Sequence, residues 1–263
     1  MDFWQAARLI LMPATNSTSR FSDRVENYVR YRPGYPTEAL EVLKNDCGLT
    51  PAHVVADIAY GTGLWTQLLL ENGNRVFGVE PNTEMRAAGE RLLARFPAFT
   101  SMAGTAEATT LPEESVDLVT AAQAAHWFDR ARARREFERI LRPGGWLALL
   151  WNERLIETTP FLRDYEQLLL TYGTDYKEVR HERTGVNEFF DPLRFEQRLF
   201  PNIQEFDYSG IEGRLLSSSY VPAPGDAKYE PMLRDLRKIF NAHAVNDRAK
   251  FEYQTRVYFG RLK

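Results

Sequence analysis

The sequence predicts an α/β fold, in which a mostly parallel sheet carries helices on both faces. From about residue 50 to residue 152, short apolar runs typical of buried strands alternate with stretches of helical periodicity. Hydrophobic residues make up 44% of the 263-residue chain and charged residues 26%, an ordinary globular composition. A chain of this length buries enough surface to fold without a metal or disulfide.

The elements can be placed in order from the N-terminus. We expect an irregular arm that ends in a short helix, capped by Ser22 or Asp23, and then a second helix capped by Thr37. Five strands are expected over His53–Ile58, Arg75–Val79, Phe99–Ala103, Val116–Ala121 and Trp146–Trp151. Between them, helices are expected over Leu64–Glu71, Asn82–Phe96 and Asp129–Leu141.

The pattern changes after residue 152. Helices are expected over Thr159–Tyr172 and Tyr229–His243, and strands over Phe200–Tyr208 and Phe251–Phe259. The two late strands should pair antiparallel on the same sheet, with the helical material forming a cap over the strand ends. We therefore predict three parts: an N-terminal arm and lid helix (1–36), a ligand-binding core (37–152), and a cap insertion with the final strands (153–263).

Charge and cysteine content narrow the function classes. The net charge of −3 and the pI of about 5.9 disfavour nucleic-acid binding, and the apolar runs are shorter than the roughly 20 residues of a membrane span. Cys47 is the single cysteine, which excludes an internal disulfide and a cysteine-based zinc site, and we predict no metal. Without a recognisable export signal, the cytoplasm is the expected location, for a monomer or homodimer.

A glycine loop follows the first strand, in the sequence Asp57-Ile58-Ala59-Tyr60-Gly61-Thr62-Gly63. Glycines let a backbone approach a ligand, and the helix that follows contributes polarised N–H groups. A dinucleotide fingerprint needs a third glycine, where this chain has Thr66, so a nicotinamide-dependent oxidoreductase is disfavoured. No Gly-Lys-Ser/Thr follows, which excludes a phosphate-binding P-loop.

Polar motifs also end the next three strands. Glu80 ends the second strand and can accept both hydroxyls of a ribose. Gly104–Glu107 follows the third strand and Gln123–Trp127 follows the fourth. Because the carboxyl ends of parallel strands lie at one edge of the sheet, we expect these motifs to surround one ligand.

With these motifs, from about Phe21 to Trp151, the sequence resembles the class I S-adenosylmethionine-dependent methyltransferases, near the ubiquinone-biosynthesis and trans-aconitate enzymes of the small-molecule branch. The resemblance implies a Rossmann-like sheet of seven strands, mostly parallel with an antiparallel last strand. It also implies S-adenosylmethionine as cofactor and a small-molecule acceptor, with no nucleic-acid or membrane partner.

The resemblance assigns roles to the glycine loop and to the acid after it. Gly61 and Gly63 would make room for the methionine portion of the cofactor, and Asp57 would organise the loop. Glu80 would bind the ribose.

The same resemblance assigns the later motifs to the rest of the cofactor. Pro81 and Met85 would lie near the adenine, and Ala106 and Glu107 would face its amine. Gln123 would line the sulfonium side.

Two residues depart from the family pattern. Ala59 stands where the family has glycine, and Tyr60 stands where it has a small residue. An alanine adopts positive φ only with strain, although we still count Ala59 among the cofactor-binding residues. These departures leave a second hypothesis open, a catalytically inactive S-adenosylmethionine-binding protein that keeps the fold.

The chemistry at the acceptor is also left open. His126 is the candidate general base for a protonated acceptor, and the alternative is that it only packs beside Trp127. A carboxylate acceptor would need no base and would instead bind an arginine such as Arg32 or Arg154. Tyr28 and Arg32 could also form a lid that meets the carboxylate of the cofactor; the alternative is a surface helix that packs its tyrosines on the sheet edge.

Overall fold

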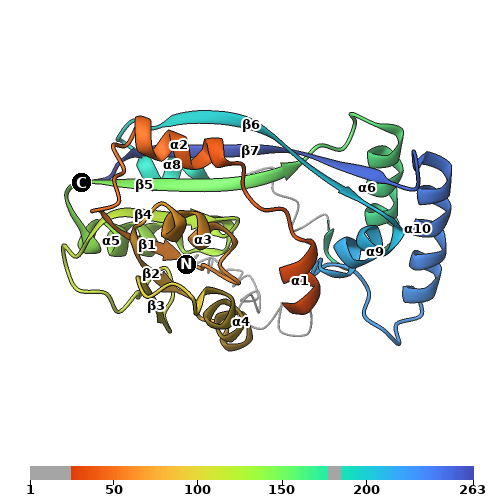
Figure 1. Cartoon of the computed structure of the whole chain (residues 1–263), viewed down its shortest axis with the longest axis horizontal. Coiled ribbons are helices and arrows are strands. Elements are labelled where there is room, and N and C mark those ends of the chain that lie inside the picture. The colour runs from red at the N-terminus through yellow and green to blue at the C-terminus, as the bar shows by residue number, and fades with distance from the viewer. Residues whose placement is uncertain (1–24, 177–184) are drawn as a thin grey trace, which may run out of the picture.

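The computed structural model describes residues 25–176 and 185–263, and within them it has one seven-stranded sheet in the order β3-β2-β1-β4-β5-β7-β6 (Figure 1). The strands are β1 (Val54–Ile58), β2 (Arg75–Val79), β3 (Phe99–Met102), β4 (Val116–Ala122), β5 (Leu141–Arg154), β6 (Glu196–Phe206) and β7 (Ala249–Arg261). Strands β1 to β5 pair in parallel, and β7 runs antiparallel to both β5 and β6. The predicted fold class, including the antiparallel last strand, is confirmed.

The helices of the described residues alternate with the first five strands and then form a separate group. They are α1 (Val25–Tyr31), α2 (Thr37–Asn45), α3 (Leu64–Glu71), α4 (Thr83–Leu93), the 3-10 turn η2 (Ala125–Trp127), α5 (Arg130–Ile140), α6 (Pro160–Tyr172), α8 (Val186–Phe190), α9 (Tyr208–Leu216) and α10 (Tyr229–His243).

Both faces of the sheet are covered by helices, as the apolar strands predicted. Side chains of α2 and α3 pack on one face, where they meet Val55 of β1. Side chains of α5 and α8 pack on the other face, where they meet Ala56 and Ile58. Successive residues of β1 thus enter opposite layers, which explains why the strand is apolar throughout.

Three of the predicted helices have side-chain caps in the described residues, which the sequence analysis did not predict. The side chains of Asn82, Asp129 and Thr159 each accept a hydrogen bond from a backbone N–H in the first turn of α4, α5 and α6. The predicted cap at Thr37 is wrong: Pro36 is the capping residue, its ring offers no acceptor, and Thr37 is already helical. The caps expected at Ser22 or Asp23 lie outside the described residues.

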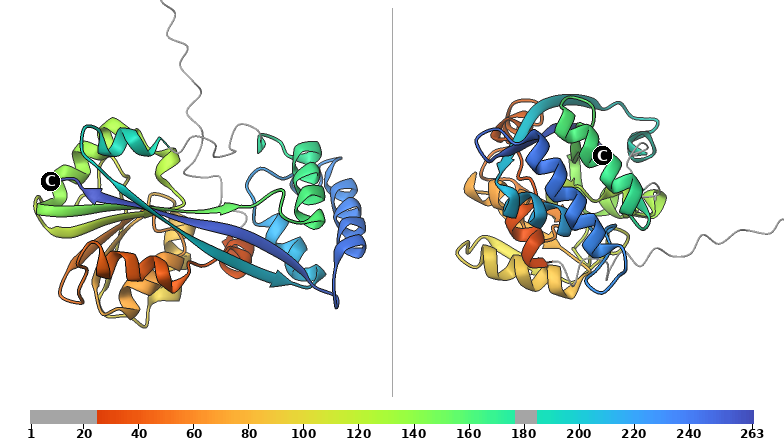
Figure 2. Two further views of the ribbon diagram at one scale, coloured as in Figure 1. Left: turned by 90° about the horizontal axis from the view of Figure 1, so that it is seen from above. Right: turned by 90° about the vertical axis from the view of Figure 1, so that its right-hand side faces the viewer.

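The last three strands extend beyond the core and carry the cap, which we define as α6, α9 and α10 (Figures 1 and 2). Strand β5 begins directly after α5 and is much longer than the predicted Trp146–Trp151. The three cap helices share an apolar cluster with Phe251 and Tyr253 of β7. The cap is therefore attached through the sheet itself, and helix α1 lies between cap and core in Figure 1 and in the left view of Figure 2.

The division of the chain into parts at residues 36 and 152 stays a prediction. None of the helices in the described ranges has the length and apolar composition needed to cross a membrane.

Candidate functional site

Asp57 anchors the loop that follows β1. Its buried carboxylate accepts hydrogen bonds from the hydroxyls of Thr66 at 2.6 Å and Thr120 at 2.9 Å. Burial raises the pKa of Asp57 to about 7, against the opposing effect of these two hydrogen bonds. The side chain therefore ties β1 to α3 and β4, and it fixes the start of the loop.

The loop itself turns through three left-handed residues. Ala59, Gly61 and Gly63 have φ values of 56°, 61° and 89°. The N–H of Ala59 donates to the carbonyl of Val79 at 2.7 Å, so the neighbouring strand β2 holds this conformation in place. Gly63 has a φ of 89°, which side-chain-bearing residues rarely adopt, and a Cβ there would also lie 2.6 Å from the side chain of Leu93, so glycine is strongly favoured.

Tyr60 fills a space between β2 and α4 that two glycines leave open. A Cβ at Gly78 or Gly89 would lie 2.7 or 2.5 Å from the Tyr60 ring. The hydroxyl of Tyr60 donates to the carbonyl of Arg86 at 3.1 Å and lies 2.9 Å from the hydroxyl of Ser101. The bulky residue at this position is therefore accommodated by packing and hydrogen bonds below the loop.

Glu80 lies directly beside the glycine loop. Its carboxylate accepts the N–H of Gly61 at 3.0 Å and the N–H of Asn82 at 2.8 Å. The residue is only 6% exposed, and burial raises its pKa despite these two bonds. Each carboxylate oxygen keeps a further lone pair for a ligand hydroxyl.

Two adjoining cavities open around this loop. The larger has a volume of about 570 Å³ and the smaller about 200 Å³. The residues that border both are Tyr28, Arg32, Ala59, Gly61, Ala122, Gln123 and Tyr220. The cavities therefore meet at the glycine loop and beneath α1.

The structure brings together every predicted site residue except Gly63. Besides the residues that border both cavities, the smaller cavity is bordered by Glu80, Pro81, Met85, Ala106, Glu107 and His126. The larger cavity is bordered by Asp57. Gly63 borders neither cavity. A glycine at this position is explained by its left-handed φ and by the close approach of Leu93, not by contact with a ligand.

Two predicted residues of the strand ends fix the neighbouring backbone. Gln123, with a φ of 59°, accepts the N–H of Asn152 on its side-chain oxygen at 2.8 Å, which joins the tips of β4 and β5. Glu107 accepts the N–H of Asp129 at 2.9 Å. His126 packs with its ring centre 4.7 Å from that of Trp127, and it borders the smaller cavity only.

Helix α1 contributes Tyr28 to both cavities, and Arg32, which also lines both, follows the last turn of this helix. The guanidinium of Arg32 lies over the ring of Tyr28 at 5.0 Å and donates to the carbonyl of Ser217 at 2.9 Å. Burial, and secondly the charge of Arg214, lower the pKa of Arg32. This hydrogen bond ties the segment after α1 to the C-terminal end of α9 in the cap.

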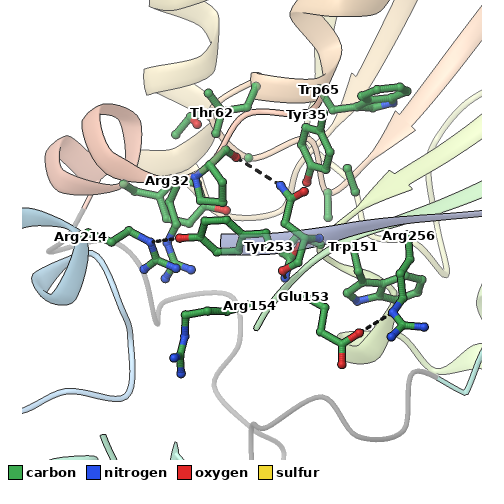
Figure 3. A pocket seen from close by; sticks show the side chains of 18 of the residues that line it. Arg32, Tyr35, Thr62, Trp65, Trp151, Glu153, Arg154, Arg214, Tyr253 and Arg256 are labelled. Carbon is green, nitrogen blue, oxygen red and sulfur yellow. Dashed lines mark hydrogen bonds and ion pairs between the residues drawn. The ribbon is translucent and has the colours of Figure 1, made fainter. Parts of the chain in front are cut away.

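The part of the chain that follows β6 contributes residues that the sequence motifs did not reveal. Arg214 of α9, Tyr220 and Tyr253 border the larger cavity, where the Nε of Arg214 donates to the hydroxyl of Tyr253 at 3.0 Å (Figure 3). These residues follow no strand of the parallel core, so no strand-end pattern marked them. Arg154, which the sequence analysis named as a possible partner of a carboxylate acceptor, lies at the end of β5 and borders the same cavity.

Comparisons with known proteins give one consistent result. Residues 56–149 match the family model described as a methyltransferase domain. An uncharacterized methyltransferase of Mycobacterium tuberculosis is 44% identical over 177 residues, which is 67% of this chain and 68% of that protein. An uncharacterized methyltransferase of Schizosaccharomyces pombe is 31% identical over 90% of this chain and 95% of its own.

Solved structures show the same fold. A structure from Anaeromyxobacter dehalogenans, named as a type II methyltransferase, superposes with a TM-score of 0.65 and 23% identity, over 88% of this chain and 98% of its own. The geranyl diphosphate C-methyltransferase of Streptomyces coelicolor, solved with S-adenosyl-L-homocysteine, has a TM-score of 0.52 and 13% identity, over 95% and 99% of the two chains.

Proposed function

The chain belongs to the class I S-adenosylmethionine-dependent methyltransferases, and from this we propose that it methylates a small-molecule acceptor held between core and cap. The observation that carries the proposal is the junction of the two cavities at the glycine loop, beside the carboxylate of Glu80. One cavity can hold the methyl donor while the other holds the acceptor, and both reach the same backbone.

The smaller cavity and the shared loop suit S-adenosylmethionine chemically. The buried carboxylate of Glu80 can accept the two ribose hydroxyls, and the apolar surfaces of Pro81 and Met85 can flank a planar base. The turn at Ala59 and Gly61 brings backbone rather than side chains against the ligand. Arg32 and Tyr28 border both cavities, so they can reach the carboxylate of the cofactor.

When bound, the cofactor supplies an electrophilic methyl group with a good leaving group. The chain has to hold the acceptor in line with that methyl group and keep water out. Gln123, Ala122 and Tyr220 border the junction of the two cavities and are placed to do this. His126 as a general base stays a prediction, and its position on the smaller cavity alone favours contact with the cofactor.

The second hypothesis, an inactive protein that only binds S-adenosylmethionine, rested on Ala59 and Tyr60. Ala59 adopts the left-handed backbone that a glycine would use, and Tyr60 is accommodated by Gly78 and Gly89. Both observations support an active enzyme. The cytoplasmic location and a monomeric or homodimeric state stay predictions from the sequence.

The experiment that tests the proposal has two readouts. Calorimetry should detect binding of S-adenosylmethionine and S-adenosylhomocysteine by the purified chain. Incubation with S-adenosylmethionine and a library of small acceptors should release S-adenosylhomocysteine only when a suitable acceptor is present. Binding without turnover of any acceptor supports the inactive protein, and the absence of binding refutes the proposal.

A further inference from the structure

Three arginines from different parts of the chain meet on one wall of the larger cavity. Arg32 follows α1, Arg154 ends β5, and Arg214 belongs to α9 (Figure 3). Figure 3 shows them apart from the ion pair of Glu153 and Arg256, which lies on the other side of the view. The wall therefore concentrates positive charge in a chain whose net charge is −3.

The carboxylates of the described residues balance only part of this charge. Arg154 pairs with Glu166 and also donates to the hydroxyl of Tyr176 at 3.0 Å. Among the described residues, Arg214 donates to neutral groups only, the hydroxyls of Tyr253, Ser217 and Ser218. Arg32 donates to a backbone carbonyl, and no ion pair in the described part of the chain includes Arg32 or Arg214.

Buried donors around the larger cavity are also left without acceptors. Within the described residues, the Nε of Arg32, the Nη1 of Arg154 and the indole nitrogen of Trp151 are buried and have no hydrogen-bond partner. Leaving a buried cation unpaired, or a buried donor unsatisfied, is costly. The donors border a cavity that is open to a ligand, so the ligand is the natural source of the missing acceptors.

The pKa of Tyr220 is shifted by the same three arginines. Burial alone raises the pKa of a tyrosine, but here Arg214, Arg32 and Arg154 outweigh the burial, and the pKa of Tyr220 is lowered. The electrostatic field of the wall therefore favours negative charge at a position that borders both cavities.

We propose that the methyl acceptor carries a carboxylate group, which Arg214 and Arg154 bind in the larger cavity. This inference rests on the proposed methyltransferase function and names its substrate class. Arg32 borders both cavities and is left for the carboxylate of the cofactor, so Arg214 remains as the cation that needs an anion from the acceptor. Guanidinium groups bind carboxylates through paired hydrogen bonds, and the aromatic rings of Trp151 and Tyr258 can cover the organic part of the molecule.

The substrate side of the test compares matched acceptors. Carboxylic acids of varied size are each paired with their primary amide, which has a similar shape but no charge, and phosphate monoesters form a third group. Formation of S-adenosylhomocysteine measures turnover, and calorimetry on the complex with S-adenosylhomocysteine measures acceptor binding. We expect turnover of an acid at a kcat/KM at least roughly tenfold above that of its amide.

The protein side compares Arg214→Gln with Arg237→Gln. Arg237 is a cap arginine that packs on Tyr208 and does not border the larger cavity, so it is the matched control. Arg214→Gln should raise KM for the acid by roughly 10–100-fold, lower the preference for acid over amide, and leave the affinity for S-adenosylhomocysteine unchanged. If Arg214→Gln fails to fold, Arg214→Lys keeps the charge and should still prefer the acid.

The outcomes separate this inference from the proposed function. Failure of the wild type to bind S-adenosylmethionine or S-adenosylhomocysteine refutes the proposed function. Equal turnover of amides and acids, or preference for phosphate monoesters, refutes the carboxylate assignment alone. The carboxylate assignment is also refuted if the complex with S-adenosylhomocysteine binds none of the acids with a Kd of about 1 mM or tighter. It is refuted as well if Arg214→Gln keeps the wild-type preference for acid over amide.

Discussion

Replacing Ala59 by glycine should stabilise the protein. Ala59 has a φ of 56°, which costs an L-residue with a Cβ about 1–2 kcal/mol and costs glycine almost nothing. Glycine also gives the unfolded chain more freedom, which removes about 0.4–1 kcal/mol of that gain. The net expectation is an increase of about 0.5–1 kcal/mol in the free energy of unfolding.

Urea denaturation of wild type and variant measures this difference, with Ala124→Gly as the control. Ala124 is also buried and close to the site, but its φ is −130°, so glycine there relieves no strain and should destabilise by about 0.5–1 kcal/mol. The affinity for S-adenosylhomocysteine should be kept or improved in Ala59→Gly. If Ala59→Gly destabilises the protein as much as Ala124→Gly does, the inference that the backbone is strained at Ala59 is refuted.

Three further predictions concern the surroundings of the loop. Burial raises the folded-state pKa of Asp57 to about 7, whereas an unfolded aspartate titrates near about 4. Because the folded state binds more protons between these two values, the free energy of unfolding should fall as pH rises from about 4 to about 7. Asp57→Asn should flatten this slope in urea denaturation at a series of pH values, and an unchanged slope would mean that other groups cause it. Gly89→Ala should destabilise the protein by about 1–3 kcal/mol, because the new Cβ would lie 2.5 Å from the Tyr60 ring. If the variant unfolds thermally at the wild-type temperature, this packing of Tyr60 is contradicted. If the carboxylate itself receives the methyl group, no proton has to be removed, so His126→Ala should retain turnover within about tenfold and show no new pH dependence. A loss of about 100-fold or more would instead identify His126 as a general base.

The core could be predicted closely because its signals are local. The boundaries of Leu64–Glu71 and Arg75–Val79 agree residue for residue with α3 and β2, since a glycine turn and polar residues flank each apolar run. The position of Glu80 beside Gly61 followed from the topology of parallel strands, which meet at one edge.

The cap side of the site could not be predicted in the same way. Arg214 lies on a short helix between β6 and β7, and it reaches Tyr253 only because the last strands extend far beyond the core. No spacing in the sequence records that approach. The accommodation of Tyr60 likewise depends on Gly78 and Gly89, which are distant in sequence and close only after folding.

The most direct test of the central claim is a calorimetric titration of S-adenosylhomocysteine into the wild type, Glu80→Ala and the surface control Glu41→Ala. If Glu80 binds the ribose in the site beside the glycine loop, the wild type and the control bind equally. Glu80→Ala then loses about 1.5–3 kcal/mol, a rise in Kd of roughly 10–150-fold, because charge-assisted hydrogen bonds are removed. Equal affinity of all three proteins, or no binding by the wild type, would contradict the account.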